Sequence, residues 1–168
     1  MDKKTRRLTL SALFTAFCVI SLYIASVWPT GQLGLTAFAS LFVAAAIIES
    51  GLSFGLYVFI AGSALGMLLL PNKIAPLLYI LFFGYYPIIK SLIERINGIL
   101  LQWTLKLLVF NAALTVIWVF LKELFFGFID NTLSVALLYL GGNAVFALFD
   151  YGFSKVVLFY AEIVHKRG

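Results

Sequence analysis

The sequence predicts an all-α membrane protein, a compact bundle of six transmembrane helices that forms one domain over residues 1–168. Three observations favour this fold. Apolar residues make up 63% of the chain and charged residues 11%, whereas a soluble domain carries about 25% charged residues. Six apolar stretches are separated by very short turns, and each is long enough to approach the roughly 20 residues that cross a bilayer. None alternates apolar and polar residues as the strands of a membrane barrel do.

The predicted spans cover residues 8–27, 33–49, 51–70, 75–96, 98–120 and 132–164. The first follows a basic cluster, and its apolar run of about 20 residues exceeds the core of a secretory signal peptide, which favours a span. The turn Glu49-Ser50-Gly51 separates the second from the third, and Pro87 predicts a kink in the fourth. A loop with Asp130 precedes the sixth stretch, which is more than 30 residues long. Two interpretations of that length stay open: a bend at Gly141-Gly142, or an end that runs along the cytoplasmic surface.

The placement of lysine and arginine predicts the orientation, because basic residues are retained on the cytoplasmic side during insertion. With six spans, three basic clusters share one side: Lys3-Lys4-Thr5-Arg6-Arg7, Lys90 with Arg95, and Lys166-Arg167. The opposite side receives Lys73 and Lys122. We therefore expect both termini in the cytoplasm. The net charge of +5 then reflects topology rather than nucleic-acid binding.

Several classes of function lack their characteristic residues. No phosphate-binding loop of the type G-x-x-x-x-G-K-[ST] is present, so the chain is not expected to hydrolyse ATP. The single histidine, His165, and the single cysteine, Cys18, offer neither a metal-ligand set nor a nucleophile with a nearby base. Asp150 is expected to stand alone in its span. We therefore expect no enzymatic activity, no catalytic residue, no metal and no cofactor in this chain, and a packing role for Cys18.

Two spans carry small residues at the spacing that lets membrane helices approach closely. In the first span these are Ala12 and Ala16, directly after the basic cluster. In the third they form a stripe of four glycines: Gly51, Gly55, Gly62 and Gly66. We expect the glycine stripe to pack within the chain's own bundle. The alanine pair is equally consistent with internal packing and with a partner helix.

Polar and aromatic residues recur on one face of each of the last three spans, which points to a cavity or to internal pairs. These faces are Tyr79, Phe83 and Tyr86; Asn111, Thr115, Trp118 and Lys122; and Tyr139, Asn143, Phe146 and Asp150. Because neighbouring spans run in opposite directions, Asn111 is expected near the depth of Asn143 or below it. Trp118 and Lys122 are expected level with Tyr139. Converging faces predict a pocket open to the outside, with seven substrate-binding residues: Tyr79, Tyr86, Asn111, Trp118, Lys122, Tyr139 and Asn143.

A second interpretation of these faces needs no ligand. Tyrosine and tryptophan gather at bilayer boundaries, and asparagines form hydrogen bonds between membrane helices. Lys106, in the fifth span, is expected to extend its ammonium group toward the cytoplasm.

The topology and the first span together give the chain a resemblance to one family. Six short spans, two cytoplasmic ends and no ATPase motif accompany a basic cluster that runs into Leu8-Thr9-Leu10-Ser11-Ala12-Leu13-Phe14-Thr15-Ala16. The chain resembles the substrate-binding S components of energy-coupling factor (ECF) transporters, the vitamin and micronutrient importers of bacteria and archaea. The resemblance in topology covers essentially the whole chain, and the specific resemblance is confined to the first span.

This resemblance implies a prokaryotic plasma-membrane protein that captures a micronutrient from outside. It implies association with a coupling transmembrane subunit, which Ala12 and Ala16 would contact, and with two ATPase subunits that use ATP. The ligand site would involve the outer halves of spans four to six and the loop 28–32. A different class stays open: a membrane scaffold such as the cell-shape protein MreD, which has similar length and span number. A scaffold needs a partner face but no pocket.

Overall fold

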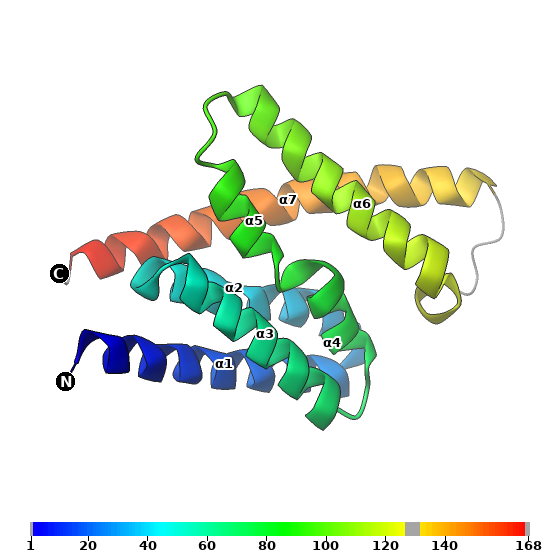
Figure 1. The fold of residues 1–168 in the computed structure, drawn as a ribbon. Helices are drawn as coiled ribbons and strands as arrows, with labels where there is room; N and C mark the ends of the chain where they lie inside the picture. Colours follow the sequence, from blue (N-terminus) through cyan, green and yellow to red (C-terminus); the bar gives the residue numbers. More distant parts are fainter. Residues whose placement is uncertain (1, 127–131, 167–168) are drawn as a thin grey trace. The chain divides into compact units, whose positions relative to one another are not determined.

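A computed structural model describes residues 2–126 and 132–166 of the chain. For Lys3, Pro29 and the helical residues 120–126 and 132–134 it describes the backbone alone. All regular secondary structure within these ranges is helical (Figure 1). Six helices, with the joined segments of 74–93 counted as one, are long and apolar enough to cross a membrane. The predicted all-α fold with six spans is therefore confirmed.

The observed helices follow the predicted spans closely. They are α1 (Lys3–Val27), the short 3-10 turn η1 (Pro29–Gly31), α2 (Gln32–Ser50), α3 (Leu52–Leu69), α4 (Ile74–Leu78), the π-helical turn η2 (Tyr79–Phe83), α5 (Tyr86–Ile93), α6 (Ile99–Phe126) and α7 (Thr132–His165). The fourth span ends at Ile93 rather than at residue 96, because the chain turns there and passes through Gly98. The φ of Gly98 is +113°, which few residues other than glycine adopt.

By its internal contacts the chain divides into two compact units. The first unit comprises Met1–Ser91 and Val157–Gly168, and the second comprises Leu92–Val156. The helix α7 therefore contributes residues to both. The expectation of a single domain stays a prediction.

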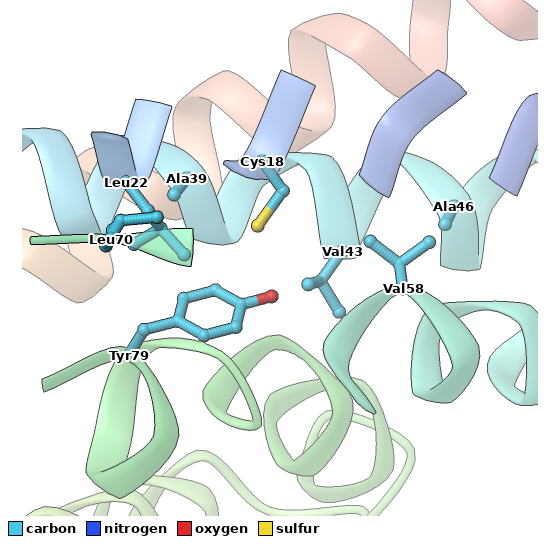
Figure 2. Close-up of a cluster of buried hydrophobic side chains, with 8 residues drawn as sticks. All are labelled: Cys18, Leu22, Ala39, Val43, Ala46, Val58, Leu70 and Tyr79. Carbon is cyan, nitrogen blue, oxygen red and sulfur yellow. The ribbon is translucent and has the colours of Figure 1, made fainter. Parts of the chain in front are cut away.

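The first unit is built on α1, α2 and α3, which lie side by side and pack in all three pairings (Figure 1). The short helix α4 packs on all three, and η2 packs on α2. The core of the unit is a cluster of buried side chains (Figure 2): Cys18, Leu22, Ala39, Val43, Ala46, Val58, Leu70 and Tyr79. Cys18 is fully buried there, so its predicted packing role is confirmed.

Close approach of α3 to its neighbours depends on glycine. Gly55, Gly62 and Gly66 are buried. A Cβ atom at Gly62 would lie only 3.2 Å from the Sγ of Cys18 in α1. The predicted internal packing is therefore confirmed for these three glycines. Gly51 differs, because it is exposed and joins α2 to α3 with a φ of +100°.

The fourth span is not a continuous α-helix. At the end of η2, the amide of Gly84 donates to the carbonyl of Tyr79, five residues earlier, at 2.7 Å. The chain then turns at Gly84 and Tyr85 before α5 begins. Pro87 has no amide hydrogen, and its ring excludes the carbonyl four residues earlier from an α-helical bond. The interruption therefore lies where Pro87 predicts a kink. Widened turns of this kind are frequent near functional sites.

Candidate functional site

The second unit brings the polar faces of α6 and α7 together. The side-chain amides of Asn111 and Asn143 form a reciprocal pair, with N···O distances of 2.8 Å and 3.0 Å. One turn along α6, the hydroxyl oxygens of Thr115 and Tyr139 lie 2.8 Å apart. We call these four side chains the polar seam. The depth predicted for Asn111 relative to Asn143 is the one observed.

Apolar contacts hold the same two helices beside the polar seam. The rings of Phe110 and Phe146 stack with centroids 4.6 Å apart and planes inclined by 10°. A Cβ atom at Gly142 would lie 3.3 Å from a methyl carbon of Leu114. Helical structure continues through Gly141-Gly142 without a break. Gly142 therefore allows close approach of α6 and α7 and does not interrupt α7.

The hydrogen bonds of the polar seam use every polar hydrogen that its side chains carry. Asn111 donates one N–H to the backbone carbonyl of Leu107 and the other to Asn143. Asn143 donates to the backbone carbonyl of Tyr139 and to Asn111. The hydroxyl of Thr115 donates to the backbone carbonyl of Asn111 at 2.7 Å, so the hydroxyl of Tyr139 must donate to Thr115. Only oxygen lone pairs remain for other partners.

A buried ion pair lies nearer the start of α6. The Nζ of Lys106 is 3.1 Å from a carboxylate oxygen of Asp150 and 2.8 Å from one of Glu94. The side chains of Lys106 and Asp150 are 6% and 3% exposed. The structure gives Asp150 a lysine partner from α6 rather than a second aspartate in its own span. The ammonium group of Lys106, which was expected to extend toward the cytoplasm, lies buried against Asp150.

This ion pair was not predicted, because its two members are far apart along the chain. Lys106 and Asp150 are 44 residues apart, and only the antiparallel pairing of α6 with α7 brings them to one level. The pattern within any one span contains only one member of this pair. The predicted pairing of Asn111 with Asn143 could have identified the ion pair. Lys106 lies between one and two turns before Asn111 on α6, and Asp150 lies about two turns after Asn143 on the antiparallel α7.

The remaining predicted site residues of α6 lie beyond the polar seam. Trp118 is half-buried, three residues after Thr115 and on the same face. Tyr139, which was expected level with Trp118 and Lys122, bonds to Thr115 instead. The side chain of Lys122 lies outside the described residues.

Tyr79 and Tyr86 belong to the first unit, and both are fully buried. Tyr79 is part of the core, with its hydroxyl directed between Cys18 and Val43 (Figure 2). Tyr86 packs on Phe82, with ring centroids 5.0 Å apart. Neither ring presents a surface to an open pocket in the described chain, and substrate contact at these two residues stays a prediction.

The small residues of α1 face away from the helices that pack on it. Ala12 and Ala16 are exposed, and the apolar surface continues at Ile20, which is 54% exposed. The opposite face of α1, which carries Cys18 and Leu22, is fully buried. Within the first unit, the glycine face of α3 is therefore buried by internal packing, whereas the alanine face of α1 is exposed.

An open depression of about 470 Å³ lies at the other end of α1. It is lined by Tyr23, Ile24, Val27, Trp28 and Thr30. Trp28 and Thr30 belong to the loop 28–32 that the family resemblance includes in a ligand site. Tyr23, Ile24 and Val27 were not predicted to line a site, although they lie about one helical turn apart at the end of α1, next to that loop. At a rise of 1.5 Å per residue, the depression begins at Tyr23, roughly 10 Å along α1 from Ala16.

Comparisons of the chain with protein-family models, with curated proteins and with solved structures find no match. In the part of the chain that the structure describes, no three His, Cys, Asp or Glu side chains gather as a metal site requires. Function is therefore inferred from the chemistry of the alanine face, the depression and the polar seam.

Proposed function

We propose that this chain is the substrate-capturing membrane subunit, or S component, of an ECF-type importer for a vitamin or another micronutrient in a prokaryotic plasma membrane. The observation that carries the proposal is the exposed pair Ala12 and Ala16, in a bundle where α3 buries its three helical glycines. Small residues spaced by four let a second helix approach closely. A subunit without an ATPase motif needs such a face to join a coupling subunit and the two ATPase subunits that use ATP.

The arrangement of surfaces along α1 supports the same proposal. Lys4, Arg6 and Arg7 are exposed at the start of the helix, next to the alanine face, and basic residues of this kind favour the cytoplasmic side. The depression at the far end of α1 has a volume within the range of about 300–1,000 Å³ typical of small-molecule sites. A capturing subunit requires its partner face and its ligand face on opposite sides of the membrane.

A scaffold of the MreD type is the second candidate, and the polar seam favours it. The side-chain amides of Asn111 and Asn143 donate all their hydrogens to each other and to backbone carbonyls of their own helices. Asparagines paired in this way join membrane helices without a ligand. A scaffold shares the need for a partner face with the S component, so a ligand is what distinguishes them.

Docking is tested by co-expression with a coupling subunit and two ATPases, followed by affinity purification of the assembly. Ala12→Trp with Ala16→Trp is expected to reduce the recovered coupling subunit by more than about tenfold, since indole rings prevent close helix approach. The matched control is Ile60→Trp with Ala64→Trp, an exposed pair at the same spacing on α3. Undiminished assembly of the alanine-face variant would show that the docking role is wrong.

Ligand capture is tested separately on the detergent-purified protein. Small molecules released by denaturation are identified by mass spectrometry, and a vitamin panel is screened by thermal unfolding. A molecule that binds only the folded state raises the unfolding temperature. Co-purification of a micronutrient, with a matching thermal shift, supports the S component. No released molecule and no shift across the panel would favour the scaffold.

A further inference from the structure

The first turn of α1 carries exposed cations that have no ion-pair partner in the described chain. Lys4, Arg6 and Arg7 are exposed. Within the residues that the structure describes, none of the three forms an ion pair with a carboxylate. We call these three side chains the basic turn. With Lys3, the sequence places four cations in residues 3–7. Their charge is therefore left for a partner outside the chain.

The length of α1 places the basic turn at the head groups of a bilayer. At a rise of 1.5 Å per residue, residues 8–27 extend about 30 Å along the helix, which matches the thickness of the hydrocarbon core. Trp28 follows them, is 65% exposed, and is of the residue type that gathers at membrane–water boundaries. When Trp28 lies at one boundary, the basic turn therefore lies just outside the hydrocarbon at the other.

An apolar face of α1 continues from the basic turn into the hydrocarbon. Leu13 and Phe17 follow Arg6 by about two and three helical turns, so the three side chains share one side of the helix. Leu13 is 48% exposed and Phe17 is 44% exposed. The side of α1 that carries Cys18 and Leu22 is buried in the core. One side of α1 therefore offers a phospholipid a cation for its phosphate and an apolar surface for an acyl chain.

We propose that the basic turn binds the phosphate of an anionic phospholipid of the surrounding bilayer, whose acyl chain lies along Leu13 and Phe17. Hydrogen bonds from guanidinium groups to phosphate oxygens are charge-assisted and therefore strong. Each lysine or arginine beside an anionic membrane surface adds about a fivefold preference for that surface. A zwitterionic phosphatidylcholine carries the same phosphate, but its choline group repels the arginines. The proposal does not rest on the transport function, because a scaffold would present the same turn to the same lipids.

The test compares two lipids with the same acyl chains and different head groups, dioleoyl phosphatidylglycerol and dioleoyl phosphatidylcholine. The detergent-purified chain is mixed with equal amounts of both, and the lipids that stay bound are counted by native mass spectrometry. The ratio of bound phosphatidylglycerol to bound phosphatidylcholine is expected to be at least about fivefold, the preference that a single basic residue provides. A smaller ratio overturns the proposal.

Three double variants connect the preference to the basic turn. Arg6→Gln with Arg7→Gln is expected to lower the lipid ratio at least about fivefold, because two charges are lost. Arg6→Lys with Arg7→Lys keeps both charges and should change the ratio less than about twofold. The matched control is Arg95→Gln with Lys155→Gln, which removes the same charge from two exposed cations that have no other lysine or arginine within four residues. Equal losses in the control and in the glutamine variant of the basic turn would overturn the proposal.

An acidic segment of a partner protein is the other candidate for the basic turn, and assembly with the coupling subunit distinguishes it. If Arg6→Gln with Arg7→Gln keeps the wild-type lipid ratio and loses the coupling subunit, the turn binds a protein and the lipid proposal is wrong. Ala12→Trp with Ala16→Trp should keep the lipid ratio, since the alanine face lies roughly 100° around α1 from Arg6. A wild-type chain that prefers phosphatidylglycerol but does not assemble contradicts the transport function alone.

Discussion

Alanine at Gly84 is the sharpest single test of how the fourth span packs. The backbone of Gly84 is α-helical, with φ −70° and ψ −42°, so alanine fits its conformation. A Cβ atom there would lie 2.7 Å from Cδ2 of Phe59 in α3 and 2.7 Å from Cε1 of Tyr79. The close approach of Gly84 to Phe59 of α3 therefore depends on the missing side chain and not on a special backbone angle.

The expected magnitude follows from these distances. Carbon atoms pack at about 3.5–4.0 Å, so both rings must withdraw by roughly 0.8 Å or more. Tyr79 is fully buried in the core and has no open space to enter. Because two rings are displaced, the expected loss in the free energy of unfolding is near the upper end of the range for overpacking, about 3 kcal/mol. Alanine favours helical backbone more than glycine does, and this preference offsets about 1 kcal/mol of the loss. We expect Gly84→Ala to lower the free energy of unfolding by about 2 kcal/mol.

The assay is unfolding of the detergent-solubilised protein by sodium dodecyl sulfate, followed by far-ultraviolet circular dichroism. The matched control is Gly141→Ala in the middle of α7, where a Cβ atom meets nothing within 4 Å and about 1 kcal/mol of stabilisation is expected. The two variants should therefore differ by about 3 kcal/mol. Phe59→Leu should restore part of the loss in Gly84→Ala. Equal stability of the two alanine variants would refute the close packing of Gly84 against Phe59 and Tyr79.

Two further predictions concern the pairing of α6 with α7 and use the same unfolding assay. Leucine at Asn111, at Asn143 and at both should reveal a coupling free energy of about 0.5–1.7 kcal/mol, the range of interhelical hydrogen bonds in membranes; strictly additive effects would contradict the pair. Lys106→Met should lower the free energy of unfolding by about 3 kcal/mol because it leaves the buried carboxylate of Asp150 without its cation. Lys155→Met, at an exposed lysine of α7, should change stability by less than about 0.5 kcal/mol, and equal losses in both would contradict the buried pair.

The spans could be predicted from the sequence because the bilayer sets their length, and hydropathy within each segment is a local property. The interruption of the fourth span was predictable at Pro87, since proline acts through its own ring. The π-helical turn η2 could not be predicted from the sequence. It packs on α2, and Gly84, which follows it, lies close to Phe59 of α3. Contacts between segments that are distant in the chain do not appear in a local sequence pattern.

The same turn changes how the aromatic side chains of the fourth span are placed relative to one another. A period of 3.6 residues places Tyr79, Phe83 and Tyr86 on one stripe. A turn closed over five residues rotates the helix after it relative to the helix before it, so the stripe does not continue through η2. Tyr79 points into the core of the first unit as a result. On α6 and α7, which are regular in the described ranges, the same period correctly placed Asn111 opposite Asn143.

The polar seam has a structural task whether or not a ligand binds. In the apolar windows of α6 and α7 only 17% of residues are buried, against 39% in α1 and 44% in α2. Lipid tails are as apolar as leucine, so α6 and α7 gain little by burying further apolar surface, and their register must be specified by polar contacts. A slip of one turn would place Lys106 opposite Phe146 or Ser154 instead of Asp150.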